Sequence, residues 1–113
     1  MWVSNAKQAA SYYTSRMGFE YYAYRGLETG SRQWCSHVIK NGNIMFMFTS
    51  PLNPGEEEFA KHLKDHGDGV RDVAFLCDDA RGIYNKAVSR GAKGIREPEE
   101  LTDENGTMIV ATI

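Results

Sequence analysis

The first apolar residues of the chain are spaced as on one face of a helix. The set, which follows Asn5 directly, comprises Ala6, Ala9, Ala10, Tyr13 and Met17. Spacing of this kind predicts an amphipathic helix. Ser4 or Asn5 can accept a hydrogen bond from a free amide at its start, and Gly18 stands where a glycine commonly ends a helix.

Three stretches with strand-like patterns come next. Residues 19–25 are rich in aromatic side chains, and residues 34–40 and 44–49 form two further strands with an Asn-Gly turn between them. The glycine-containing stretch 26–33 is typical of a hairpin connection. The third strand, IMFMFT, is apolar on both sides, so we expect it to be central in a sheet or covered on both faces.

The middle of the chain predicts one more helix and one more strand. A turn-rich stretch with three consecutive glutamates opens a short helix, in which Phe59, Leu63 and His66 share one side. Residues 70–77 then alternate between two faces, which predicts a strand.

The last third of the chain begins with a second amphipathic pattern. Its apolar stripe comprises Ala80, Ile83, Tyr84, Ala87 and Val88. Gly91 ends this predicted helix. A short strand over 92–96 is closed by Pro98, residues 97–105 are interpreted as a polar loop, and residues 106–113 as a final strand.

The stretches 5–26 and 79–98 resemble each other. When Asn5 is laid on Asp79, an alanine, a serine and an arginine also coincide, and after a one-residue slip the two terminal glycines coincide. A duplicated strand-helix-strand unit within one domain explains this pattern, and chance similarity of two amphipathic helices is the alternative. Only MWVS precedes the first helix, whereas a full strand precedes the second, so we expect the sequence to be cropped at its start.

Composition narrows the class of protein. The 113 residues suffice for one domain with its own core, and the 42% hydrophobic and 25% charged residues are those of an ordinary globular protein. The net charge of −2, with both signs interspersed, argues against a nucleic-acid partner. No apolar run is long enough for a membrane span. Cys35 and Cys77 are interpreted as free thiols of a reducing compartment, which predicts a cytoplasmic protein.

Histidines are the first candidates for a metal site. His62 and His66 stand four positions apart on the predicted helix, as in a zinc-binding pair, but Leu63 occupies the position of the glutamate that makes this motif specific. We interpret both as solvated or capping side chains. His37 lies in a predicted strand and is interpreted as half-buried and hydrogen-bonded.

The acidic residues and cysteines give no stronger motif. Asp72, Asp78 and Asp79 gather around the strand 70–77, and Asp78 or Asp79 is interpreted as the cap of the next helix. The glutamates at 56–58, 97, 99 and 100 are interpreted as solvated turns. Neither cysteine has the close partner of a Cys-x-x-Cys motif. We predict no catalytic, cofactor-binding or metal-binding residue in the chain.

Longer strings of the sequence resemble an enzyme family. WVSNAKQAASYYTSRMGFEYYAYRGLETGSR, together with SHVI, HGDGVRDVAF and RGAKGIREP, resembles the 4-hydroxyphenylpyruvate dioxygenases of animal type over essentially the whole chain. The resemblance implies the vicinal-oxygen-chelate, glyoxalase-like α+β fold, in which paired βαβββ modules form a half-open barrel of mostly antiparallel strands. Residues 1–113 then correspond to a single N-terminal domain fragment, cropped at both ends. Module one spans about 1–50, a linking helix about 55–66 and module two about 70–113.

The resemblance also implies a function for the longer parent protein. Enzymes of this family convert 4-hydroxyphenylpyruvate to homogentisate in tyrosine and phenylalanine catabolism, using iron(II) held by two histidines and a glutamate of the C-terminal domain. No position of this chain matches those ligands, and Asp72 stands where a metal-binding module would place a histidine. The segment is therefore expected to be structural, inactive and without a cofactor of its own. Its expected partners are the C-terminal catalytic domain of the same chain and a second subunit of a homo-oligomer, a dimer.

Two other functions stay open. A free-standing glyoxalase-like metal enzyme would assemble its site from His37, Asp72 and a carboxylate across a dimer. A binding module would instead capture a small aromatic ligand at the barrel mouth with the rings of Tyr21, Tyr22, Tyr24 and Trp34. The alternative for these rings is that they form core and interdomain contacts.

Overall fold

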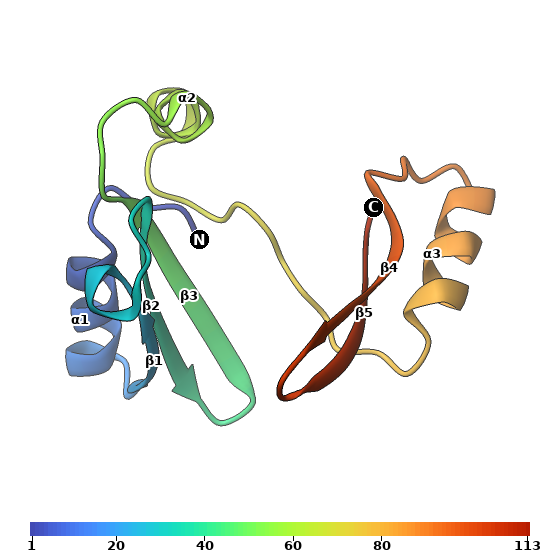
Figure 1. The fold of residues 1–113 in the computed structure, drawn as a ribbon, viewed down its shortest axis with the longest axis horizontal. Helices are drawn as coiled ribbons and strands as arrows, with labels where there is room; N and C mark the ends of the chain where they lie inside the picture. Colours follow the sequence, from blue (N-terminus) through green and yellow to red (C-terminus); the bar gives the residue numbers. More distant parts are fainter. The chain divides into compact units, whose positions relative to one another are not determined.

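The computed structural model describes residues 1–113 and divides into two compact units (Figure 1). Unit 1 is Met1–Val73 and unit 2 is Ala74–Ile113. Unit 1 contains, in chain order, α1 (Ala6–Arg16), β1 (Glu20–Arg25), the 3-10 helix η1 (Leu27–Thr29), β2 (Trp34–Asn41), β3 (Ile44–Pro51) and α2 (Glu57–His66). Unit 2 contains α3 (Ala80–Ser89), β4 (Arg96–Asp103) and β5 (Gly106–Thr112).

The first helix begins and ends where the sequence predicts. The amide of Gln8 donates to the side-chain oxygen of Asn5 at 3.0 Å, which satisfies one of the free amides at the start of α1. Gly18 follows the helix with φ of 71°, a left-handed conformation that glycine adopts without steric cost. The apolar stripe faces the sheet, except that Met17 is largely exposed.

The strands of unit 1 form an antiparallel sheet in the order β1-β2-β3. Strands β2 and β3 pair without interruption from the Trp34–Pro51 pair to the Asn41–Ile44 pair. The pairing of β1 with β2 shifts register between Tyr21 and Ala23, so that Tyr22 is an unpaired bulge residue.

The chain start lies beside β3. Trp2 forms a parallel bridge with Thr49 and an antiparallel bridge with Gly69. The amide of Val3 donates to the Thr49 carbonyl at 3.0 Å, and the amide of Thr49 donates to the Met1 carbonyl at 2.9 Å. With this short strand-like segment ahead of α1, unit 1 has the βαβββ order that the sequence predicts, which confirms the predicted fold class.

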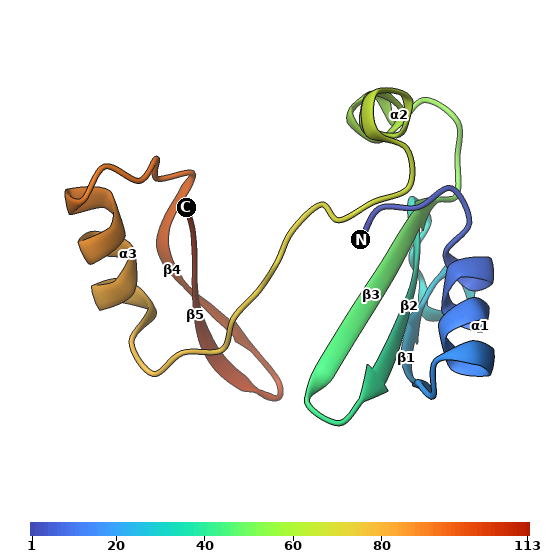
Figure 2. The ribbon, with the colours of Figure 1, turned by 180° about the vertical axis from the view of Figure 1, so that it is seen from behind.

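The core of unit 1 lies between α1 and one face of the sheet. The buried side chains are Val3, Ala6, Ala10, Ile39 and Phe48, with Phe46, Tyr13 and Phe19 packed against them. Figures 1 and 2 show α1 on this face of the three strands. The small alanines let the helix lie close to the sheet and exclude water from Phe48, which is buried beneath it.

The opposite face of this sheet carries no α1 equivalent within unit 1. Met45 and Met47 on that side of β3 are 58% and 54% exposed. Of the two alternatives predicted for residues 44–49, the central position is the one the structure has, because β3 lies between β2 and the chain start, which bridges to it at Thr49. The strand is not covered on both faces, since Met45 and Met47 are exposed.

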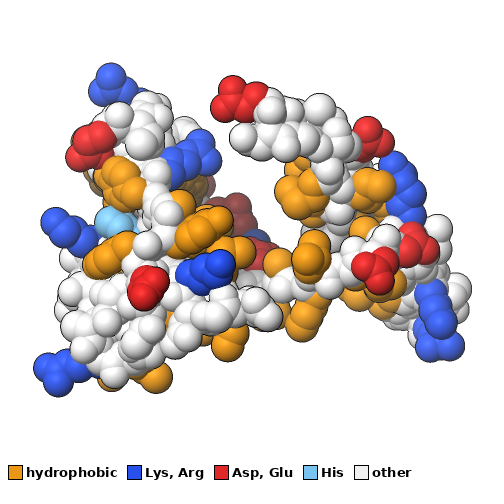
Figure 3. All heavy atoms as spheres, turned by 90° about the horizontal axis from the view of Figure 1, so that it is seen from below, with side chains coloured by type: hydrophobic (Ala, Val, Ile, Leu, Met, Phe, Trp, Pro, Cys, Tyr) orange, Lys and Arg blue, Asp and Glu red, His pale blue; other side chains and the backbone are white.

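Unit 2 is a helix with a two-stranded sheet. The amide of Gly82 donates to the Asp79 carboxylate at 2.8 Å, so Asp79, and not Asp78, caps α3. Strands β4 and β5 pair antiparallel around a tight turn, where the amide of Asn105 donates to the Asp103 carboxylate at 2.7 Å. Apolar side chains such as Ile83, Ile95 and Met108 are largely exposed, and such side chains reach the surface of both units in the space-filling view (Figure 3).

Three predicted elements differ from the structure. Residues 70–77 form no strand, because a strand requires a paired backbone and this segment has no ladder partner. The predicted short strand 92–96 is absent, because β4 begins only at Arg96. Most of the predicted polar loop 97–105 belongs to strand β4. Polar β4 residues such as Glu100 pair with the apolar Ile109, and a register shift between Arg96 and Glu99 accommodates Pro98.

No helix of this chain has the length and apolar character that crossing a bilayer requires.

Candidate functional site

One row of side chains crosses the face of unit 1 that lies away from α1. Arg25 pairs with Ser36, Ser36 pairs with Thr49, and Thr49 bridges to Trp2, so these four residues stand opposite one another on neighbouring strands. Residues directly opposite in a sheet project from the same face. The row therefore runs from a cation through two hydroxyls to an indole.

This row lines an open hollow of about 320 Å³. The next row, Ala23, Val38 and Met47, gives the hollow an apolar part of its floor. The volume is at the lower end of the range of small-molecule pockets.

An aromatic stack forms one wall of the hollow. The Trp2 ring lies 6.2 Å from that of Trp34 and 4.9 Å from that of Phe59, in stacked orientations. Phe59 is buried and projects from α2, so this helix supports the indoles. The Arg71 guanidinium lies 5.0 Å from the Trp2 ring, within the range of a cation–π interaction.

The two hydroxyls of the row bond to each other. The Ser36 Oγ and Thr49 Oγ1 atoms are 2.9 Å apart, and the two residues are only 7% and 9% exposed. Two hydroxyl groups hold two protons, and their mutual hydrogen bond uses one. One O–H donor therefore remains available at the floor of the hollow.

The tyrosines proposed for ligand capture do not converge. Tyr24 and Trp34 are among the residues around the hollow, whereas Tyr21 and Tyr22 are not. The Tyr24 ring itself packs 4.9 Å from the His37 ring, and its hydroxyl donates to Glu28 at 2.6 Å. Gly26 permits this, because a Cβ at that position would overlap the Tyr24 hydroxyl.

The Tyr24–Glu28 hydrogen bond shifts both acids. It raises the pKa of the Tyr24 phenol well above 10.0, because ionisation would remove the proton that the bond requires. The same bond lowers the pKa of the Glu28 carboxyl below 4.5, since it stabilises the carboxylate. Both side chains are exposed, which fits a surface clasp between β1 and η1 rather than a reactive centre.

His37 lies on the α1 side of the sheet, on the middle strand β2, between Tyr24 and Phe48. Burial lowers the pKa of its imidazole below 6.5, and the positive charge of Lys7 lowers it further. Its aromatic neighbours are Tyr24 and, with ring centres 6.4 Å apart, Tyr21. The half-buried position that the sequence suggested is confirmed, whereas no hydrogen bond of its side chain is found.

His62 and His66 lie together on α2, with ring centres 5.0 Å apart. The His62 ring also stands edge-on to Trp2 at 5.3 Å, and its Nε2 atom is buried without a hydrogen-bond partner. The nearby Asp65 forms an ion pair with Lys61. His62 is thus part of the packing of α2 on Trp2, which corrects its interpretation as a solvated side chain, whereas His66 is exposed.

The three aspartates do not gather into a site. Asp79 caps α3, and Asp72 acts on the Met1 ammonium, whose pKa falls through burial and is raised in part by this carboxylate. No three histidine, cysteine, aspartate or glutamate side chains converge anywhere in residues 1–113. The two-histidine, one-carboxylate set that the resemblance implies for iron(II) therefore finds no fit among these residues.

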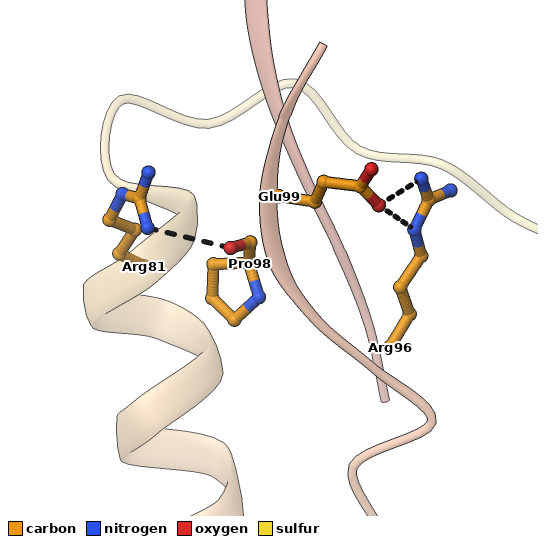
Figure 4. Close-up of polar contacts among 4 residues, drawn as sticks. All are labelled: Arg81, Arg96, Pro98 and Glu99. Atoms are coloured by element: carbon orange, nitrogen blue, oxygen red, sulfur yellow. Dashed lines mark hydrogen bonds and ion pairs between the residues drawn. The ribbon is translucent and has the colours of Figure 1, made fainter.

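The charged residues of unit 2 hold its helix to its hairpin (Figure 4). The Arg81 guanidinium of α3 donates to the Pro98 carbonyl at 3.4 Å and lies 3.9 Å from the Glu100 carboxylate. Arg96 and Glu99 form an ion pair along β4, in which the Arg96 Nε donates at 2.9 Å. Of the glutamates predicted to lie in solvated turns, Glu97, Glu99 and Glu100 thus lie on an exposed strand, and Glu56–Glu58 lie at the start of α2.

The sequence pattern indicates none of the four residues of the row. Trp34, which the sequence offers as a ligand-binding ring, lines the hollow but pairs with Pro51 outside the row. The alternation of side chains along 34–40 places Trp34, Ser36 and Val38 on one face of the strand, and this is the signal from which Ser36 could be found. Arg25 could not be assigned to that face, because the bulge at Tyr22 breaks the alternation of β1.

The chain matches the model of a known protein family and several known proteins. Residues 1–112 match the model of the Glyoxalase/Bleomycin resistance protein/Dioxygenase superfamily. A 4-hydroxyphenylpyruvate dioxygenase from Dictyostelium discoideum is 50% identical over 112 residues, which cover 99% of this chain and 30% of that protein. One from Xenopus tropicalis is 52% identical over 112 residues, covering 99% and 28%. The chain thus spans about 30% of the length of these relatives and matches their N-terminal part.

Solved structures agree with the sequence comparison. A mutant of 4-hydroxymandelate synthase from Streptomyces coelicolor superposes with a TM-score of 0.80 at 28% identity, covering 95% of this chain and 31% of that chain. A hypothetical protein from Bacillus halodurans C-125 gives a TM-score of 0.71 at 15% identity, covering 98% and 78%, which is a likeness of fold alone.

Proposed function

Because the chain belongs to the Glyoxalase/Bleomycin resistance protein/Dioxygenase superfamily, we propose that it is the non-catalytic N-terminal domain of a 4-hydroxyphenylpyruvate dioxygenase. The longer protein is a cytoplasmic iron(II) enzyme that converts 4-hydroxyphenylpyruvate to homogentisate in tyrosine and phenylalanine catabolism. The segment serves as scaffold: it packs on the C-terminal catalytic domain of the same chain, within a homodimer.

One observation carries this proposal. About half of the residues are identical to the N-terminal part of several 4-hydroxyphenylpyruvate dioxygenases, over 99% of the chain. Identity at this level along nearly the whole chain supports a shared place in the longer protein.

The surface of the chain supports a packing role. Large apolar side chains are exposed in both units, among them Tyr21, Met47, Phe75, Ile83 and Ile95. Exposed apolar side chains in this number are typical of a domain that buries them against other parts of an assembly. Neither the histidines nor the carboxylates form a three-ligand set, so we assign no step of the oxidation to this chain.

The proposal is tested by an activity assay on the 113-residue chain. Oxygen consumption is measured with 4-hydroxyphenylpyruvate and iron(II) for this chain alone and for the Dictyostelium discoideum relative as the active reference. We expect no turnover by the chain alone. Turnover by the chain that requires stoichiometric iron(II) would show that these residues form an active site, and the scaffold role would be abandoned.

A further inference from the structure

The two histidines of α2 form a feature that the scaffold role does not use. His62 and His66 stand four positions apart on this helix, with ring centres 5.0 Å apart. Side chains at this spacing lie on the same side of a helix, and two histidines so placed can hold one metal ion. We propose that His62 and His66 together bind a divalent transition-metal ion of the class that imidazole prefers, namely Ni²⁺, Cu²⁺ or Zn²⁺.

The separation of the two rings fits a shared ion. Two imidazoles that bind one tetrahedral ion at about 2.1 Å have ring centres roughly 5 Å apart. The rings of His62 and His66 already have this separation. Rotation about side-chain bonds is therefore sufficient to direct one nitrogen of each ring to the same ion, and the backbone of α2 need not move.

The His62 ring carries an atom that lacks a partner. Its Nε2 is buried and forms no hydrogen bond, whereas buried polar atoms of folded proteins are nearly always paired. The ring is already held edge-on to Trp2, with 5.3 Å between the ring centres. A metal ion at Nε2 supplies the missing partner. His66 is exposed, so it is the ring that turns to admit the ion.

The charges around the two rings are balanced. The histidines line a small hollow of about 170 Å³ together with two cations, Lys61 and Arg71. Arg71 donates to the Glu58 carboxylate at 3.0 Å, and Lys61 pairs with Asp65. Each carboxylate offsets a positive charge that would repel a metal ion. Because both carboxylates are engaged, the chain supplies two ligands, and water fills the other positions of the ion.

The missing glutamate of the zinc-protease motif does not weaken this assignment. Leu63 stands at the position of that glutamate. In the motif the two histidines are the ligands, and the glutamate is a general base. Its absence therefore removes the hydrolytic chemistry of the motif and leaves the ability of the two histidines to bind an ion.

A titration with the metal alone tests the proposal. We add NiCl₂ to the 113-residue chain and measure binding by calorimetry, and we expect one Ni²⁺ per chain. In NMR spectra, paramagnetic Ni²⁺ should broaden the ring signals of both histidines and the indole N–H signal of Trp2, whose ring contacts His62. Co²⁺ should bind more weakly than Ni²⁺, and Mg²⁺, which requires oxygen ligands, should not bind.

A matched pair of histidine variants locates the ion. His66→Ala is expected to weaken Ni²⁺ binding by about tenfold or more. This side chain is exposed, so its loss leaves α2 packed on Trp2. His37→Gln removes the remaining histidine of the chain, which lies in β2, and should leave the affinity unchanged.

A second pair of variants tests the helical spacing. In the His66→Ala chain, Glu58→His places a new imidazole four positions before His62 and should restore Ni²⁺ binding. Lys64→His adds the same ring two positions after His62, on a different side of the helix, and should not restore it.

Several outcomes would overturn the proposal. They are the absence of saturable Ni²⁺ binding, an unchanged affinity in His66→Ala, equal restoration by Glu58→His and Lys64→His, and loss of binding when both cysteines are replaced by serine. Unshifted amide signals outside α2 would confirm that each variant is folded. Metal binding at α2 does not rest on the scaffold role, since it is measured without substrate and independently of iron-dependent turnover.

Discussion

Tyr24 and Glu28 are joined by a hydrogen bond of 2.6 Å in which the phenol O–H donates to the carboxylate. The bond links the end of β1 to η1 across the turn at Gly26. Because it needs a protonated phenol and an ionised carboxyl, it is present only between the two titrations.

The first prediction concerns the pH dependence of this bond. Glu28→Gln should lower the pKa of Tyr24 toward 10.0, and Tyr24→Phe should raise the pKa of Glu28 toward 4.5. Phenolate absorbance checks the first shift and carboxyl chemical shifts check the second.

The raised pKa of Tyr24 stabilises the folded state below pH 10.0 and this contribution is lost as pH rises above it. The lowered pKa of Glu28 stabilises it above pH 4.5 and is lost as pH falls.

One result would contradict this prediction for Tyr24 and Glu28. If the Tyr24 phenol keeps the same pKa in the Glu28→Gln variant, the hydrogen bond is not the cause of its shift.

The second prediction concerns the buried hydroxyl pair. Thr49→Val should lower the free energy of unfolding by about 1–3 kcal/mol, because the Ser36 hydroxyl is left buried without a partner. The double variant Ser36→Ala with Thr49→Val should cost less than the sum of the two single changes. Amide hydrogen exchange in the β2–β3 hairpin measures the effect.

A matched control exists in unit 2. Thr102 and Thr107 also have hydroxyls 2.9 Å apart, but both residues are exposed. Thr102→Val should therefore change the protection of the β4–β5 hairpin by less than about 0.5 kcal/mol. A cost as large as that of Thr49→Val would contradict the role assigned to burial.

The third prediction concerns the segment that lacks a partner. Phe75 is 86% exposed and Leu76 is fully exposed, and neither lies in a paired strand. A protease needs an extended, unpaired backbone, so brief chymotrypsin treatment should cut first after one of these two residues. Mass spectrometry identifies the fragments, and replacing both by serine should slow the cut. First cleavage after Tyr21 or Tyr22 in β1 would contradict the prediction.

The fourth prediction concerns the two free thiols. Cys77 is exposed in an unpaired segment, whereas Cys35 is half-buried in β2. A thiol-specific chromogenic reagent should react in two phases, because access limits the reaction of the thiolate. Cys77→Ser should remove the fast phase and Cys35→Ser the slow one. A single phase in the unaltered chain would mean that both thiols are equally accessible.

The elements that could be predicted are those with their own local signals. Helix α1 has a cap at Asn5 and a terminator at Gly18, and α3 has the corresponding pair at Asp79 and Gly91. The β2–β3 hairpin has its turn at Gly42, which adopts a left-handed conformation as expected. These features depend on a few neighbouring residues, so a single sequence contains them.

The elements that could not be predicted depend on distant residues. Whether residues 70–77 form a strand is decided by a partner backbone, and the alternation of side chains there carries no record of one. Glu99 and Glu100 are typical of a loop, yet they are held in β4 by pairing with Val110 and Ile109. For the same reason the sequence does not predict the row from Arg25 to Trp2. The register between four separate segments brings its residues together.

The bulge at Tyr22 sets how the sheet tolerates changes in chain length. Strand β1 contains one residue more than its pairing with β2 uses, so a deletion of one position there leaves Arg25 opposite Ser36. Strands β2 and β3 pair with each other without an extra residue. Losing one residue from either strand would therefore turn every side chain beyond that point to the opposite face of the sheet. Shortened natural or designed versions of this domain should therefore carry their gap in β1.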